Sequence, residues 1–143
     1  MSYIRLLCIS LVLLLSGCGE DVVIDSPQHT ALSVFKAIYI ESDMDKAYPH
    51  LSEPLVKRMK HHRIASQVQR NVFGLSLTDV SLSIGDVEGN FFQKADNAVN
   101  IEIRLEGNYG ATLVREARKV QLKHINDQWI VVKLFEDKFK NNM

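Results

Sequence analysis

The chain has 143 residues, with 17 Lys plus Arg against 17 Asp plus Glu, so its formal net charge is zero. It has no basic stripe with interleaved aromatic side chains, which argues against a nucleic-acid partner. Its two cysteines, Cys8 and Cys18, both lie close to the N-terminus. The rest of the chain therefore has no cysteine for a disulfide, a thiolate metal site or a nucleophile.

The N-terminus has the order of an export signal. Arg5 is the sole charged side chain before Cys18, and residues 6–15 are almost wholly apolar. A run of this length fits a signal-peptide core of roughly 7–15 residues and is short of the ~20 that a membrane-spanning helix needs. The following Leu15-Ser16-Gly17-Cys18 resembles the lipobox of bacterial lipoproteins.

The resemblance implies cleavage between Gly17 and Cys18, a diacylglyceryl group on the Cys18 sulfur and acylation of the new amino terminus. Two or three acyl chains hold a membrane stably, because each buried methylene adds about 0.8 kcal/mol. Gly19 is not the aspartate that favours inner-membrane retention in such proteins, so the resemblance implies an outer-membrane anchor facing the periplasm. The alternative is an apolar segment that ends in Gly-Cys by chance.

The expected division is a signal peptide at 1–17, a lipidated tether at 18–25, one domain at 26–136 and a flexible polar tail at 137–143. Removal of the signal leaves 126 residues, a normal size for one domain. Within this domain Ser26-Pro27 predicts the start of a helix that runs to about Ile40. A short second helix is expected over 45–51, and a third from Ser52 to about 71–74, with Ile64 on its buried side.

After Leu75 the apolar period changes from about 3.6 to 2, which indicates strands. The first includes Val80, Leu82 and Ile84, with a phase slip at Gly85 that suggests a bulge. After a turn at 89–90, extended by 94–97, further strands are expected at 99–105, 112–125 and 129–135. Turns are expected at 107–110 and 126–127. Helices followed by a meander of strands predict an α+β fold.

Two groups of residues resemble NTF2-like domains. The first is Ala31-Leu32-x-x-Phe35-x-x-Ile38 followed by Asp43-x-Asp45-x-Ala47-Tyr48-x-x-Leu51-Ser52, and the second is Asp127-x-Trp129-Ile130-Val131. The resemblance implies N-terminal helices packed on a curved four-stranded antiparallel sheet around a cone-shaped pocket. Some members of this family are enzymes and many only bind, so the fold does not decide the activity.

Glu116 and Arg118 form a candidate pocket pair. If the strand over 112–125 keeps one phase, both side chains share the face of Val120 and Leu122 and line the concave surface. A charged pair in an apolar cleft can orient a ligand. The favoured alternative is a bulge near Ala117 that turns both charges to solvent.

The last strand is apolar on both faces, with Trp129, Val131 and Phe135 on one and Ile130, Val132 and Leu134 on the other. Such a strand needs cover on both sides. Helices can cover one face, so the face of Trp129, Val131 and Phe135 is a candidate interface for a second copy or an envelope partner.

Other polar groups have simpler interpretations. His61 and His62 are adjacent, so they point about 100° apart on a helix and do not form a metal site. The basic residues over 57–63 favour a solvated surface, with contact to anionic lipid as the alternative. Asp43 and Asp45 resemble helix caps, and their pairing with His50 as an acid–base group is the less favoured interpretation.

We therefore expect a non-catalytic, membrane-anchored periplasmic lipoprotein that acts as a binding or assembly module, without cofactor, metal or nucleic acid. One alternative is a small hydrolase or isomerase with its site in the cone. Another is a structural subunit of a cell-envelope complex.

Overall fold

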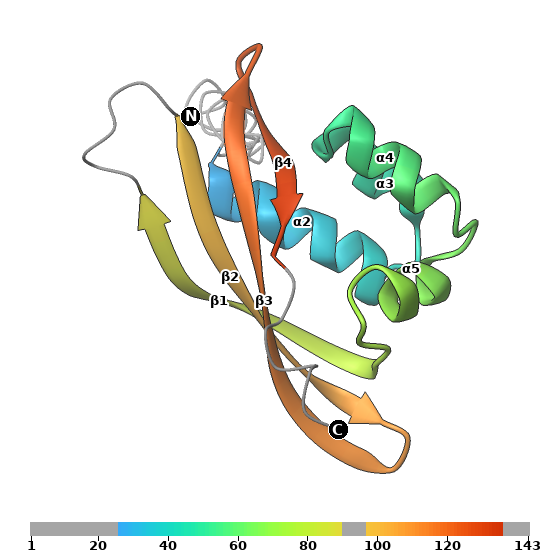
Figure 1. The fold of residues 1–143 in the computed structure, drawn as a ribbon. Helices are drawn as coiled ribbons and strands as arrows, with labels where there is room; N and C mark the ends of the chain where they lie inside the picture. The colour runs from blue at the N-terminus through green and yellow to red at the C-terminus, as the bar shows by residue number, and fades with distance from the viewer. Residues whose placement is uncertain (1–25, 90–96, 136–143) are drawn as a thin grey trace, which may run out of the picture.

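The computed structural model describes residues 26–89 and 97–135, and Figure 1 shows their arrangement. A group of helices lies against one side of a four-stranded antiparallel sheet. The helices are α2 (Pro27–Tyr39), α3 (Met44–Ala47), the 3₁₀ helix η2 (Tyr48–His50), α4 (Glu53–Lys60) and α5 (Ala65–Asn71). The strands are β1 (Thr78–Gly89), β2 (Ala98–Tyr109), β3 (Thr112–Ile125) and β4 (Gln128–Leu134). The predicted fold class is confirmed. The signal peptide, the tether, the turn at 90, most of the connection at 94–97 and the tail lie outside the described residues.

The first helix forms as its sequence predicts. Ser26 is the N-cap, and its hydroxyl accepts a hydrogen bond from the backbone N–H of His29 at 3.1 Å. Pro27 occupies the first turn, where a missing N–H costs nothing. The apolar stripe of α2 is buried and contacts all four strands, so this helix organises the core.

The second predicted helix divides into α3 and η2. The Asp43 carboxylate accepts a hydrogen bond from the Asp45 N–H at 3.1 Å, which confirms Asp43 as a cap. After η2 the chain becomes extended at Leu51, which bridges in parallel to Val131 on the edge strand β4. The Ser52 N–H donates to the Val131 carbonyl at 2.9 Å. The helical layer thus protects part of this sheet edge.

The predicted third helix is wrong as a single element, because it breaks into α4 and α5. From the buried Met59, the next inward positions of a continuous helix are His62 and Arg63, whose polar side chains do not belong in the core. The chain leaves the helix there, with Arg63 at φ 36°, and resumes at Ala65. Ile64, predicted to be buried, is 54% exposed. Ser52 is the N-cap residue of α4, as predicted, but its side chain makes no cap bond.

The sheet has the order β1-β2-β3-β4. The slip predicted at Gly85 is confirmed by a register shift between Ile84 and Val87. The turn predicted at 107–110 begins later, at Gly110, because β2 continues to Tyr109 and Gly107 pairs with Val114 inside the sheet. A side chain at Gly107 would lie 2.9 Å from the Thr78 carbonyl oxygen, so close packing explains this glycine. The 126–127 hairpin turn is confirmed.

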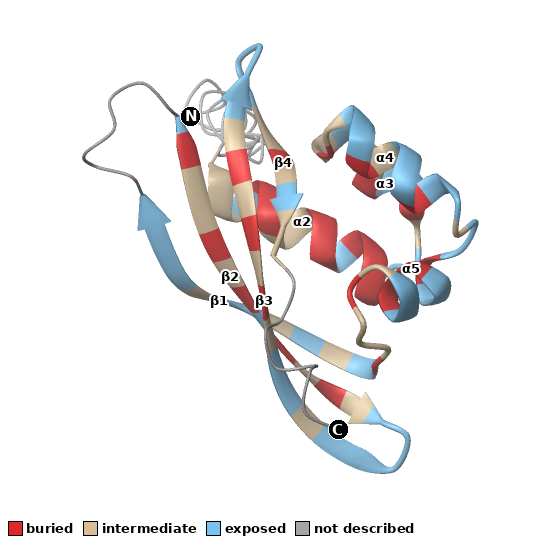
Figure 2. Ribbon diagram, in the orientation of Figure 1, coloured by how far each residue is buried: buried red, intermediate tan, exposed pale blue. Residues whose placement is uncertain are grey.

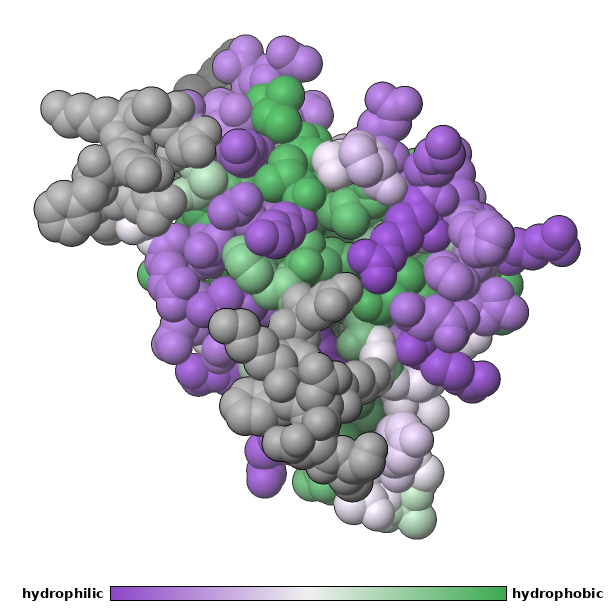
Figure 3. All heavy atoms as spheres, in the orientation of Figure 1, coloured by the Kyte–Doolittle hydropathy of each residue, from purple (hydrophilic) through white to green (hydrophobic). Residues whose placement is uncertain are grey.

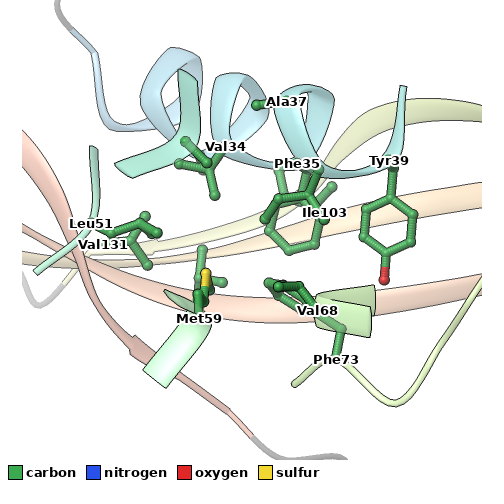
Figure 4. Packing of buried hydrophobic residues seen from close by; sticks show 14 of the residues in the cluster. Val34, Phe35, Ala37, Tyr39, Leu51, Met59, Val68, Phe73, Ile103 and Val131 are labelled. Carbon is green, nitrogen blue, oxygen red and sulfur yellow. The ribbon is translucent and has the colours of Figure 1, made fainter. Parts of the chain in front are cut away.

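The core lies between α2 and the inner side of the sheet. Figure 2 shows buried residues along α2 and the middle of β2 and β3, whereas β1 is largely exposed. In Figure 4 the rings of Phe35, Tyr39 and Phe73 meet between the helix and the strands, beside Met59 and Val68. Large apolar side chains therefore occupy the space that an open cone would need.

Candidate functional site

Strand β3 keeps one phase past Ala117. Glu116 pairs with Leu105 and Arg118 with Ile103, and the register between β2 and β3 is continuous. The favoured bulge near Ala117 is therefore wrong, and both charged residues start from the inner side of the sheet. Their surroundings differ, however, because the Arg118 side chain is 8% exposed and that of Glu116 is 47% exposed.

Arg118 donates hydrogen bonds to two backbone carbonyls. Its Nε donates to the Phe73 carbonyl at 3.0 Å, and its Nη1 donates to the Ala117 carbonyl at 2.7 Å. The contact from Nη1 to Glu116 Oε2 is longer, at 3.5 Å. Arg118 thus connects β3 to the segment that follows α5, and Glu116 stands at the rim of this contact.

Two more polar side chains nearby donate to backbone carbonyls, one on this segment and one on α2. The Tyr39 hydroxyl donates to the Leu75 carbonyl at 2.8 Å, and Gln69 Nε2 donates to the Ile38 carbonyl at 2.9 Å. Burial raises the pKa of the Tyr39 phenol far above its usual value, and the charge of Arg118 opposes this effect. These interior polar groups satisfy backbone carbonyls, which is a structural role.

The other candidate acid–base groups stay apart from the interior. Asp45 is exposed, and His50 is half-buried at the end of η2. Burial lowers the pKa of His50, and the charge of His29 adds to the effect. Among the described residues no group of three His, Cys, Asp or Glu side chains has the arrangement of a metal site.

A hollow of about 440 Å³ lies mainly on the outer side of the sheet, over β1, β2 and β3, and has a mixed polar and apolar lining. The outward residues of its lining include Ser81, Ser83, Arg104, Glu106 and Arg115, and residues from the inner side, Leu82, Leu105 and Glu116, complete it. Arg104 forms an ion pair with Glu102, and Arg115 forms one with Glu106 across the strands. Paired charges beside hydroxyl groups can accept hydrogen bonds from, and donate them to, a polar ligand. Sequence analysis did not predict this hollow, because it depends on which outward residues the three strands bring together.

Trp129, Val131 and Phe135 do not lie on one face of β4 as predicted. Val132 is an extra, unpaired residue in the pairing of β3 with β4, since Leu122 pairs with Val131 and Gln121 pairs with Lys133. This extra residue moves Phe135 to the side opposite Trp129 and Val131. Val131 is fully buried in the chain's own core, and Trp129 is half-buried against the His124 ring.

The basic residues over 57–63 lie on the outward side of α4 and in the turn after it. Figure 3 shows hydrophilic side chains gathered over α4 and α5. Leu55 and Met59 point to the core, so the cations are directed to solvent. Among the described residues no helix is long and apolar enough to cross a membrane.

No family model matches the chain, and no curated protein matches it. A solved structure described as an NTF-2 like protein of unknown function from Shewanella oneidensis MR-1 is similar to it, with 11% sequence identity and a TM-score of 0.44. The similarity covers 71% of this chain and 88% of that one.

Proposed function

We propose that this protein is a lipid-anchored lipoprotein of the bacterial envelope whose NTF2-like domain binds a partner or ligand without catalysis. The observation that carries the anchor is the lipobox-like Leu15-Ser16-Gly17-Cys18 directly after an apolar run. Cys18 is then the attachment site, and the absence of aspartate at Gly19 favours the outer membrane, with the domain in the periplasm.

The described interior supports binding over catalysis. Its buried polar residues are Thr30, Gln69 and Arg118. Gln69 and Arg118 bond to backbone carbonyls, and the rest of the interior is filled by apolar side chains. An acid–base reaction needs a titratable pair with access to substrate, so the hydrolase or isomerase alternative is less well supported. The outer hollow, with its mixed polar and apolar lining, offers a place for a ligand instead.

Detergent phase partitioning of the Cys18→Ala variant tests the anchor. The wild type is expected in the detergent phase, and the variant is expected to lose lipid attachment and its processed N-terminus. Cys8→Ala is the matched control, because it removes the other cysteine from the signal and should leave lipidation intact. A Cys18→Ala protein that has the processed size and partitions like wild type would contradict the proposal.

A structural role in an envelope complex is supported by one edge of the sheet. Ile84 and Val87 lie on the same side as the core residues Ile103 and Ile101, yet they are 38% and 44% exposed. Apolar side chains at an edge strand favour association. Sedimentation over a concentration series would show a second copy, and Val87→Ser should weaken that association if β1 carries it.

A further inference from the structure

The outward side of α4 and the turn after it carry a concentrated positive charge. Leu55 and Met59 are buried, and the exposed residues that follow the first turn are basic. We call this set the α4 basic surface, and it consists of Lys57, Arg58, Lys60 and Arg63.

These cations differ from most others in the domain, which have acidic partners. Glu41 binds Lys36 and Lys46, and Glu88 binds Lys119. Within the described residues no lysine or arginine of the α4 basic surface forms an ion pair. Lys60 instead lies 5.2 Å from the centre of the Tyr48 ring. Like charges this close together repel one another, so an anion bound at this surface would lower its electrostatic energy.

The α4 basic surface lies near the point where the chain enters the domain. η2 contacts α2, and His50 at its end is close enough to His29, in the first turn of α2, for the two charges to interact. α4 begins three residues later, at Glu53, and its eight residues span about 12 Å. The eight residues from Cys18 to Asp25 extend at most ~26–29 Å. A lipid on Cys18 therefore keeps this surface within reach of the headgroups.

We propose that the α4 basic surface rests on anionic phospholipid headgroups of the leaflet that holds the Cys18 acyl chains. This inference rests on the proposed lipid anchor, which supplies a high local concentration of phosphates. Each cation near an anionic bilayer gains binding energy, and several together orient the domain. Because α4 lies on the helical side of the sheet, this orientation directs the opposite, outer side of the sheet, with its hollow, away from the membrane.

Lysine acylation of the mature lipidated protein in vesicles tests this orientation. The protein is placed in phosphatidylcholine vesicles with or without phosphatidylglycerol, and mass spectrometry measures the acylation rate of each lysine. Lys57 and Lys60 should react severalfold more slowly in the anionic vesicles, whereas Lys119 and Lys133 on the outer side of the sheet should not change. Salt near 1 M should abolish the difference, because the screening length falls to about 3 Å.

A double variant, Arg58→Glu with Arg63→Glu, keeps both reporter lysines and reverses two neighbouring charges. It should remove the protection of Lys57 and Lys60. The control, Arg104→Glu with Arg115→Glu, makes the same charge change on the outer side of the sheet and should keep the protection. Equal rates in neutral and anionic vesicles, or protection that survives in the Arg58 and Arg63 variant, would overturn the proposal. Failure of the wild type to float with neutral vesicles would instead contradict the lipid anchor.

Discussion

Arg118 shows how one hydrogen-bond pattern separates a structural group from a ligand-binding group. Its Nε is directed at the Phe73 carbonyl, and its Nη1 bonds more closely to the Ala117 carbonyl than to Glu116. A side chain with its donors used in this way fixes the segment between α5 and β1. Glu116 has one long contact with Arg118 and a half-exposed carboxylate, so it adds little to stability.

The first prediction compares these two residues. Arg118→Met should lower the free energy of unfolding by about 2–4 kcal/mol, because it leaves the buried Phe73 carbonyl without its donor. Glu116→Gln should change the free energy by less than about 0.5 kcal/mol. Urea unfolding followed by circular dichroism measures both values. Equal losses in the two variants would show that the ion pair, not the backbone bond, holds this region.

The second prediction concerns His50. Burial, and then the charge of His29, lower the pKa of His50 below its usual value of 6.5, so the unfolded chain takes up this proton more readily than the folded one. Stability should be complete above about pH 6.5 and fall as the pH drops from there toward the folded pKa.

His50→Gln should reduce this fall, as measured by the urea midpoint at about pH 7.5 and about pH 5.5. His29→Gln should retain most of it, since burial is the larger cause of the shift. A fall of the same size in wild type and His50→Gln would assign the pH dependence to other groups.

At the scale of elements, periodicity predicted most of the fold. The bounds of α2 follow from Ser26-Pro27 at its start and an unbroken apolar stripe, and β3 was predicted with the bounds it has. The errors arose where tertiary contact overrides local pattern. Glycine favours turns, so the sequence predicts Gly107 in a turn, whereas it lies in β2, where any side chain would meet the Thr78 carbonyl. The irregular residue Val132 leaves no signal in an apolar run.

The candidate site was harder to predict than the fold. The sequence placed Glu116 and Arg118 on one face of a strand, which is correct. The sequence does not predict that Arg118 donates to the Phe73 carbonyl, because these two residues are 45 positions apart in the chain. Every residue has a backbone carbonyl, so the sequence cannot show which carbonyl an arginine will bind. A buried arginine of this kind is therefore easily interpreted as a ligand contact before the tertiary structure is known.

The third prediction tests the break between α4 and α5. Ile64 is the N-cap of α5, has no side-chain cap bond and is 54% exposed. Ile64→Asp should therefore stabilise the protein by about 0.5–1 kcal/mol, because a carboxylate caps free N–H groups. Thermal unfolding measures the change. If Ile64→Asp instead lowers the free energy of unfolding by about 2 kcal/mol or more, Ile64 must be buried, as one continuous helix would require.

For the whole molecule, the packing of β4 shows whether its apolar residues lie in the chain's own core or are free to contact a partner. Val131 lies in the core with Leu122 and Leu51, and the helical layer bonds to its carbonyl. The core therefore already uses the residue at the centre of the predicted interface. Self-association through the sheet remains a proposal, and the exposed side of β1 is better suited to it than Val131.

The fourth prediction follows from this burial. Val131→Glu should abolish cooperative folding, because it places a carboxylate among apolar side chains without a partner. Ile130→Thr, on the opposite side of β4, should leave a folded protein with a modest loss of stability. Near-ultraviolet circular dichroism and sedimentation distinguish the outcomes. A folded Val131→Glu protein that has merely lost a dimer would place Val131 in an interface after all.

The central claim is that Cys18 carries the lipid that holds this domain at a membrane. Intact-mass and peptide mass spectrometry of protein extracted from membranes test it most directly. The account predicts a chain that begins at Cys18, with a diacylglyceryl group on the sulfur and an acyl group on the amino terminus. A chain that retains residues 1–17, or begins elsewhere with an unmodified Cys18 thiol, would contradict it.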